Sequence, residues 1–306
     1  DLDMALLNNM KIGWIGPNYV PPAELTDSTD KILWELEQAK RLDCHVLHPA
    51  FPLPKDDPEA LAKIKAKMEE YDVEFELGCP RAVFELTGPD AEKAKAELQA
   101  EIDFAKAFGA KIMRTGYGKL VMETTRYYKG PGATGKEQYE TIKASLKAAA
   151  PMFEKAEIYF ALENHLDFTG HEIAAIFEEI NSPYMGIALD TANGFCIFSD
   201  PNEEVQVMAP WAITSHMKDA KVIDKTQEGD YFPLIPVGCA CGEGSVDIEA
   251  AIKAIQEKSR YPEGFHLVVE QGWFGCGLDG VEDEAAFRRN TIERSVAYLK
   301  SLVTIK

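Results

Sequence analysis

The sequence predicts a (β/α)₈ TIM barrel, in which eight parallel strands alternate with helices. Short apolar runs of strand length alternate along the chain with longer stretches whose apolar residues recur every three or four positions. There are eight such runs, and 306 residues is a usual length for one barrel. No linker or repeat divides the chain, so we expect residues 1–306 to form a single domain. A doubly wound open sheet is the alternative, but no Gly-x-Gly-x-x-Gly follows the first run.

The eight strand-like runs begin at or near Lys11, Cys44, Val73, Lys111, Ile158, Met185, Ala212 and His266. Between them, apolar residues at helical spacing form single stripes that can pack against a sheet, such as Leu61, Ile64, Met68 and Tyr71, then Ile142, Leu146, Ala149 and Phe153, and later Ile292, Val296, Leu299 and Val303. Thr87 and Asp90 precede the third helix and Gly109 follows it, as start and stop signals should. Two long connections, 117–135 and 220–244, follow strand ends, where barrel enzymes build their active sites.

Composition excludes several classes of protein. Fifty-one acidic against 32 basic residues give a net charge of −19, which repels phosphate backbones and anionic membranes and disfavours nucleic acid as a partner. No apolar run is long enough for a transmembrane helix, and residues 1–10 do not resemble a secretion signal. The six cysteines form no Cys-x-x-Cys pair, so we interpret them as reduced thiols of a cytoplasmic protein.

Four of the predicted strands end in a side chain that can bind a metal. The fifth strand ends with Glu163, the sixth with Asp190, the seventh with His216 and the eighth with Glu270. The first two separations match one strand-helix unit, and the third is one unit plus the connection 220–244. Because the carboxyl ends of barrel strands share one face, we expect the four side chains at the same height on adjacent strands.

The residues around these ends agree with a metal site. Side chains alternate along a strand, so the positions two residues before each ligand face the same way. They are small or branched enough to fill a barrel interior: Ala161, Ala188, Thr214 and Val268. Three carboxylates and one imidazole favour Mn²⁺, Mg²⁺ or Co²⁺ over a metal that prefers thiolate. Solvated acidic strand ends are the alternative, but four in register after apolar runs favour a site.

The same two-residue step identifies candidate catalytic groups. His165 follows Glu163 on the same face, and a neutral imidazole beside a metal-bound carbonyl can remove a proton from the adjacent carbon. The alternative for His165 is a hydrogen-bond donor behind the ligands, which would leave Glu163 and Glu270 as the acid-base groups. Lys218 follows the seventh-strand histidine likewise. It either holds a substrate oxygen or pairs with Asp219, and we favour the ion pair.

Other candidates for substrate contact lie near strand ends. Arg114 ends the fourth strand, whereas Asn193 and Trp273 follow the sixth- and eighth-strand ligands. Less specific candidates are Trp14, Glu76, Arg126, Tyr127 and Tyr128. A tryptophan can stack on a sugar or aromatic ring, although a core or rim role is equally compatible with its position. The sequence suggests no partner for His171 or His266.

These motifs resemble the xylose-isomerase-like, or sugar phosphate isomerase/epimerase, superfamily over nearly the whole chain. The resemblance rests on short segments that contain the four candidate ligands, namely Glu163-Asn164-His165, Asp190-Thr191-Ala192-Asn193, His216-Met217-Lys218-Asp219, Gly242-Glu243-Gly244 with Val246-Asp247, and Glu270. It implies that Glu163, Asp190, His216 and Glu270 bind one Mn²⁺-like ion.

Two differences from known members indicate which branch of the superfamily this chain resembles. Ketose 3-epimerases usually carry a histidine where this chain has Asn193 and an arginine where it has Lys221. Endonuclease-IV-like members need more histidines than the six present here. The Glu-Asn-His triplet is more similar to the α subunit of C-glycoside deglycosidases. That resemblance implies a lyase acting on 3-oxo-glycosides, in which the metal binds the C3 carbonyl oxygen, a histidine takes the C2 proton and the aglycone leaves from C1. It also implies a small β subunit, and hence a hetero-oligomer.

The ligand set alone leaves three functions open. A sugar isomerase or epimerase begins with the same deprotonation and returns the proton to carbon, whereas the lyase expels a group from the next carbon. A non-catalytic sugar-binding barrel is the third, and loss of ligands would favour it, but all four are present. We therefore expect a metal-dependent lyase on a sugar or glycoside, with the epimerase as its main alternative.

Overall fold

The computed structural model describes residues 10–120, 125–127, 134–224, 234–261, 263–272 and 277–304. Contacts within the chain cluster into two units. Unit 1 comprises Asp1–Glu76 with Thr214–Lys306, and unit 2 comprises Leu77–Ile213. We describe each by itself, and the single domain stays a prediction. Among the described residues, no helix combines the length and apolar character that crossing a membrane requires.

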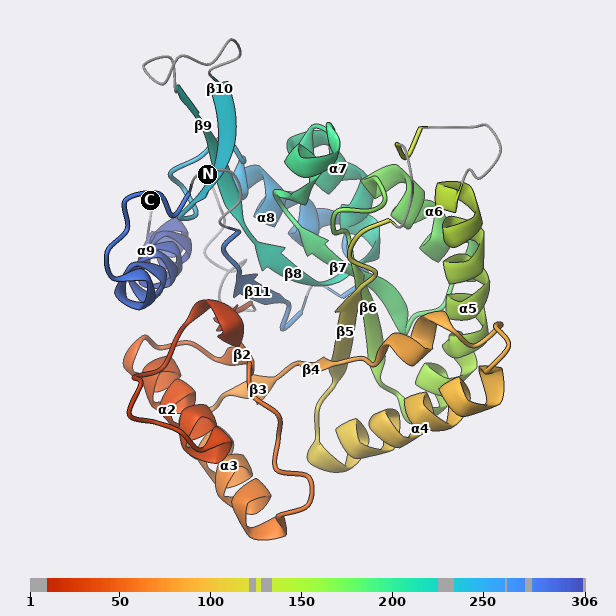
Figure 1. The fold of residues 1–306 in the computed structure, drawn as a ribbon, viewed down its shortest axis with the longest axis horizontal. Helices are drawn as coiled ribbons and strands as arrows, with labels where there is room; N and C mark the ends of the chain where they lie inside the picture. Colours follow the sequence, from red (N-terminus) through yellow and green to blue (C-terminus); the bar gives the residue numbers. More distant parts are fainter. Residues whose placement is uncertain are drawn as a thin grey trace. The chain divides into compact units, whose positions relative to one another are not determined.

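Unit 1 contains a run of parallel strands in the order β3-β2-β1-β11-β8 (Figure 1). Its strands are β1 (Lys11–Ile15), β2 (Val46–His48), β3 (Glu74–Phe75), β8 (Ala212–Met217, which begins at the end of unit 2) and β11 (His266–Val269). Its helices are η1 (Gly16–Asn18), α2 (Ser28–Arg41), α3 (Pro58–Tyr71), α8 (Ile248–Lys258) and α9 (Glu284–Thr304). Ile15, Val46 and Val268 form a buried apolar cluster on one face of these strands.

Unit 2 contains the parallel run β4-β5-β6-β7. Its strands are β4 (Leu77–Gly78), β5 (Ile112–Gly116), β6 (Tyr159–Glu163) and β7 (Met185–Asp190). The helices are η2 (Arg81–Phe84), α4 (Ala91–Phe108), α5 (Thr134–Ala156), α6 (Gly170–Ile180), η3 (Asn193–Ile197), α7 (Pro201–Met208) and η4 (Ala209–Trp211). Each of the eight predicted runs therefore contains a strand, and the run from Val73 is divided into β3 and β4.

Local signals explain where the helices begin and end. In the described part of the chain, six helices start at a side chain that accepts a hydrogen bond from a first-turn backbone N–H, namely Asp27, Asp57, Thr169, Asp200, Asp247 and Asp283. The predicted stop at Gly109 is confirmed, because this residue ends α4 with a φ of 91°. Most predicted stripes are buried, although on α3 only Ile64 is buried and its stripe neighbours are half-buried.

The connection after β8 holds a hairpin that the sequence did not predict. Strands β9 (Asp219–Asp224) and β10 (Leu234–Cys239) pair antiparallel and extend from the end of β8 (Figure 1). Val222 and Leu234 are exposed on it, so it lacks the apolar alternation that identifies a half-buried strand in a sequence. The five cysteines in the described part of the chain are free thiols, and Cys276 lies outside it.

Candidate functional site

Two of the predicted metal ligands end neighbouring strands of unit 2. Glu163 is the last residue of β6 and Asp190 the last of β7, and both are buried. Glu163 pairs with Ala188, so it lies on the face of Asp190 but one pleat lower. The two residues are therefore offset by two positions in register, although their candidate ligand atoms lie within 4.8 Å of each other. Parallel strands that close into a barrel are staggered, and residues at equal distances from strand ends need not be level.

Asn164 joins the ends of these two strands. Its side-chain oxygen accepts the Asp190 backbone N–H at 2.8 Å, and its amide group donates to the Asp190 carbonyl at 3.0 Å. The Asn164 side chain thus makes the two hydrogen bonds to Asp190 that a neighbouring strand backbone would make, at the point where β6 has ended. In the sequence, Asn164 stands out only as part of the Glu163-Asn164-His165 motif. Its signal is an amide directly after a strand, beside a candidate ligand.

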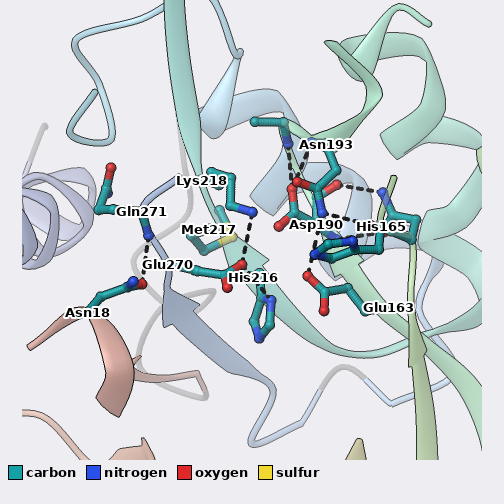
Figure 2. Close-up of polar contacts among 12 residues, drawn as sticks. Asn18, Glu163, His165, Asp190, Asn193, His216, Met217, Lys218, Glu270 and Gln271 are labelled. Carbon is teal, nitrogen blue, oxygen red and sulfur yellow. Dashed lines mark hydrogen bonds and ion pairs between the residues drawn. The ribbon is translucent and has the colours of Figure 1, made fainter. Parts of the chain in front are cut away.

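The Asp190 carboxylate is oriented by the turn that follows it. Its Oδ1 accepts the backbone N–H groups of Ala192 at 2.9 Å and Asn193 at 2.8 Å (Figure 2). The Asn193 amide group in turn donates to the Asn164 carbonyl at 2.9 Å and lies 3.5 Å from Glu163 Oε1. Asn193 is buried and bound to the ligand-bearing segments, and its role in substrate binding stays a prediction.

His165 lies beside Glu163, as the two-residue step predicted. A Cβ atom added to Gly116 on β5 would come within 3.3 Å of Glu163 Oε2 and 3.6 Å of His165 Cβ, so both side chains lie over the same glycine. The His165 ring is half-buried, and its Nδ1 lies 2.6 Å from the Gly118 carbonyl oxygen. A carbonyl accepts only, so this contact places the imidazole proton on Nδ1.

The other two predicted ligands contact each other within unit 1. His216 is the second-last residue of β8 and is fully buried. Its Nδ1 lies 2.9 Å from Glu270 Oε2 (Figure 2). Val268 is paired with His216 in strand register, so Glu270 lies two residues further along the chain on the same face. Burial acts to raise the pKa of Glu270, but the charges and hydrogen bonds of His216 and Lys218 outweigh it and lower the pKa well below its usual value. Glu270 is therefore an ionised carboxylate, as a metal ligand must be.

Lys218 does not pair with Asp219. Its Nζ lies 2.9 Å from Glu270 Oε2 instead (Figure 2). The Asp219 carboxylate accepts backbone N–H groups at 2.8–3.1 Å, from Ala220, Gly242, Gly244 and Val246. The preferred interpretation of the sequence was wrong because consecutive strand residues point to opposite faces. The structure instead explains the Gly242-Glu243-Gly244 motif, which supplies closely spaced N–H groups to one buried carboxylate.

The remaining candidates divide into core, loop and undescribed residues. Trp14 is fully buried and its ring lies 4.8 Å from that of Tyr19, so the core role holds and sugar stacking is excluded. Arg126 donates to the Asp167 carbonyl and pairs with Glu172, which makes it a loop-fixing residue. Arg114 is buried on β5. Trp273 and Tyr128 lie outside the described residues, and substrate contacts of Arg114 and Trp273 stay predictions.

Glu76, a candidate for substrate contact, and His266, for which the sequence suggests no partner, contact each other. His266 begins β11, and its ring nitrogens contact Glu76 at 2.7 Å and Glu74. Burial lowers the pKa of His266, but hydrogen bonds and charges from Glu74 and Glu76 outweigh it and raise the pKa to about 9. His266 begins β11 and Glu74 begins β3, whereas Glu76 directly follows β3, so His266 lies at the opposite end of β11 from Glu270.

Comparison with known proteins identifies a sequence relative and several solved structures of similar fold. The chain is 25% identical over 203 residues to a 3-oxo-isoapionate decarboxylase from Pectobacterium atrosepticum, an alignment that covers 66% of this chain and 64% of that protein. The match thus spans slightly less than two thirds of the relative's length. A xylose isomerase-like TIM barrel protein from Mycobacterium smegmatis, solved with magnesium, aligns over 97% of both chains with a TM-score of 0.64 and 15% identity. The 3-keto-D-glucoside 4-epimerase of E. coli covers 95% of this chain, and 99% of its own, with a TM-score of 0.62 and 13% identity.

The family assignment rests on a longer match. Residues 51–302 match the family described as xylose isomerase-like TIM barrel, which is well over half of the chain. This match and the solved structures confirm the predicted barrel fold. The chain belongs to the xylose isomerase-like TIM barrel family.

Proposed function

We propose that this chain is a divalent-metal-dependent lyase acting on a 3-oxo sugar derivative, with Glu163, Asp190, His216 and Glu270 as the ligands of one ion. Each residue offers one ligand atom, a carboxylate oxygen or an imidazole nitrogen. The donor set suits Mn²⁺, Mg²⁺ or Co²⁺. In support, a magnesium complex is known for a protein of similar fold.

The residues within each unit fit a metal ion. In unit 2, backbone N–H groups fix the rotation of the Asp190 carboxylate, and Asn164 fixes the strand end that carries it. In unit 1, Glu270 is held ionised by two cationic or polar neighbours. Ligands oriented in advance by surrounding hydrogen bonds are typical of metal sites. Closure of the family's barrel would bring the carboxyl ends of all these strands to one mouth.

The observation that carries the proposed reaction is the tautomer of His165. Because Nδ1 donates to the Gly118 carbonyl, Nε2 of the neutral ring carries a lone pair and can accept a proton. A bound divalent ion would supply a Lewis acid for the ketone oxygen of the substrate.

His165 Nε2 then removes the proton from the carbon beside the ketone, and the electrons of that C–H bond move toward the ketone oxygen as an enolate. When they return, the bond to the group on the next carbon breaks, and that group departs with its electron pair. The chain's residues thus hold the proton while the leaving group is expelled.

A lyase outcome is favoured over an epimerase by the curated relative. A decarboxylase of a 3-oxo acid is a lyase as well: it breaks the C–C bond at the carbon next to the ketone, and the electrons of that bond form an enolate of the same kind. An epimerase must in addition return a proton to the opposite face, for which Glu163 or Glu270 would be the second acid-base group. That alternative is supported by the similar fold of a 3-keto-glucoside epimerase. The β subunit, the oligomeric state and the cytoplasmic location stay predictions.

The test is mass spectrometry of products formed in D₂O with Mn²⁺, using 3-oxo-glycosides, 3-oxo acids and free ketoses as substrates. A released aglycone or CO₂ with an unsaturated or shortened sugar supports the lyase. Deuterium in an intact, rearranged sugar would instead establish an epimerase and overturn the proposal.

Two variants separate the roles of the residues. Asp190→Asn should lose the bound metal and turnover together, whereas His165→Gln should retain the metal and lose turnover. Metal content of the purified proteins is measured independently by plasma mass spectrometry. Unchanged turnover of the His165→Gln variant would exclude His165 as the base and favour the glutamates.

A further inference from the structure

The segments that follow β5 and β6 are joined through the backbone of Gly118. The Gly118 N–H donates to Asp167 Oδ2 at 2.9 Å. The Gly118 carbonyl accepts the Leu166 N–H at 2.9 Å and the His165 Nδ1–H at 2.6 Å. Three consecutive residues after β6 thus use both polar groups of one glycine, all within unit 2.

We propose that Asp167 is a positioning residue that fixes the backbone of Gly118 through its N–H, and thereby keeps the Gly118 carbonyl where it holds the His165 imidazole in the tautomer with Nε2 unprotonated. The catalytic meaning of this tautomer rests on the proposed function, because only a base needs the lone pair on Nε2. The hydrogen-bond arrangement itself does not depend on any activity.

Asp167 is suited to this task because it accepts hydrogen bonds only. Its side chain is buried, and its carboxylate accepts the backbone N–H groups of Gly118, Phe168 at 2.6 Å and His165 at 3.3 Å. Burial raises the pKa of Asp167 to about 6 against these N–H groups, so the carboxylate is ionised at pH 8. An asparagine at this position would present an NH₂ group to one of the donors, and two donors cannot pair.

Gly118 is suited because of its backbone conformation. Its φ of 107° lies in the region that side-chain-bearing residues rarely adopt. A Cβ atom added there would meet no atom within 4 Å. Alanine at this position would therefore act through the backbone dihedral alone, by turning the peptide whose carbonyl receives the His165 ring.

The experiment is long-range ¹H–¹⁵N NMR of the histidine rings in the full chain, labelled with ¹⁵N-histidine. It is recorded at pH 8 with and without diamagnetic Mg²⁺. The spectrum shows directly which ring nitrogen carries the proton. The His165 signals are assigned as those missing from the His165→Gln spectrum.

We expect the wild-type His165 ring to be protonated at Nδ1. In Asp167→Asn and Gly118→Ala, the Nδ1 and Nε2 signals should move toward each other, as two tautomers exchange. Two matched controls should leave the signals in place. Glu204→Gln alters another buried carboxylate of unit 2 that accepts a backbone N–H, from Gly170 at 2.8 Å, and Gly109→Ala alters another glycine with positive φ and no atom near its Cβ.

Protonation of wild-type His165 at Nε2 would overturn the proposal outright. Signals in Asp167→Asn and Gly118→Ala that match the wild type would also overturn it, because Asp167 would then have no influence on the ring. The proposed function fails separately: the tautomer can be as expected while no 3-oxo sugar is turned over. If turnover is found, Asp167→Asn should lower kcat more than it raises KM.

Discussion

Glu35 presents a buried carboxyl group whose ionisation should oppose folding. It lies on the buried face of α2 with Ile32, Leu36 and Ala39, and it is fully shielded from solvent. Both carboxyl oxygens are buried, and contact with the Ala50 backbone N–H offsets only part of the cost of that burial. Burial raises its pKa from 4.5 to about 8, with a smaller opposing contribution from the Ala50 backbone N–H. The group is therefore protonated in the folded chain at neutral pH and ionised in the unfolded chain.

The sign and size of the effect follow from this difference. A carboxyl group with a raised folded pKa binds its proton more tightly in the folded state, so stability falls as pH rises from 4.5 to 8. At about 1.4 kcal/mol per pH unit, the loss over that range is at most ~5 kcal/mol. For a chain of 306 residues, 1 kcal/mol corresponds to roughly 1.5 °C in the melting temperature.

The test compares thermal melts of wild type and Glu35→Gln between pH 5 and pH 8. Glutamine keeps the shape of the side chain and cannot ionise. The melting temperature of the variant should therefore rise relative to wild type by roughly 5 °C across this range. Glu24→Gln, at an exposed position outside α2, is the control and should follow the wild type. If the wild-type and Glu35→Gln curves run parallel with pH, Glu35 does not titrate as its burial implies.

Three further predictions address other parts of the chain. His266→Gln leaves Glu74 and Glu76 without their buried cation and should cost about 3–5 kcal/mol. Because the pKa of His266 is raised to about 9, this stabilisation is full below pH 6.5 and disappears as pH rises through 9, which melts at pH 6 to 10 will check. Asn164→Ala should weaken Mn²⁺ binding roughly 10–100-fold, measured by calorimetry, because it frees the end of β7; unchanged affinity would contradict this role. Asp219→Asn should increase hydrogen exchange of the Gly242 and Gly244 amides, and full protection in the variant would refute its role in this loop.

The features that the sequence predicted are those that depend on nearby residues. A strand reveals itself by a short apolar run, and Glu163, Asp190, His216 and Glu270 stand at the ends of such runs. The partner of a polar side chain depends on how neighbouring strands are aligned, and the sequence of one strand does not show this alignment. Glu76 and His266 are 190 positions apart in the chain. Their contact can be predicted only when the order of the strands in the sheet is known.

The errors have the same origin. The two-residue offset between Glu163 and Asp190 was not predicted, because the distance of each residue from its strand end is visible in the sequence, whereas the stagger between strands is not. Lys218 was paired with Asp219 because they are adjacent in sequence, although alternation turns them apart. The β9–β10 hairpin was missed because exposed strands carry no apolar period.

The two ends of β11 show why the position of a polar residue along a strand indicates whether it stabilises the fold or takes part in a reaction. It begins with His266, bound to two glutamates, and is followed directly by Glu270, bound to His216 and Lys218. The two ends thus carry similar groups. At the amino end, His266 is held protonated by Glu74 and Glu76, so at neutral pH it has no lone pair for a metal or a proton. At the carboxyl end the carboxylate is the ionised member, which is the state that a cation requires. The direction of the strand, more than the identity of its residues, therefore assigns the first cluster to folding and the second to the proposed reaction.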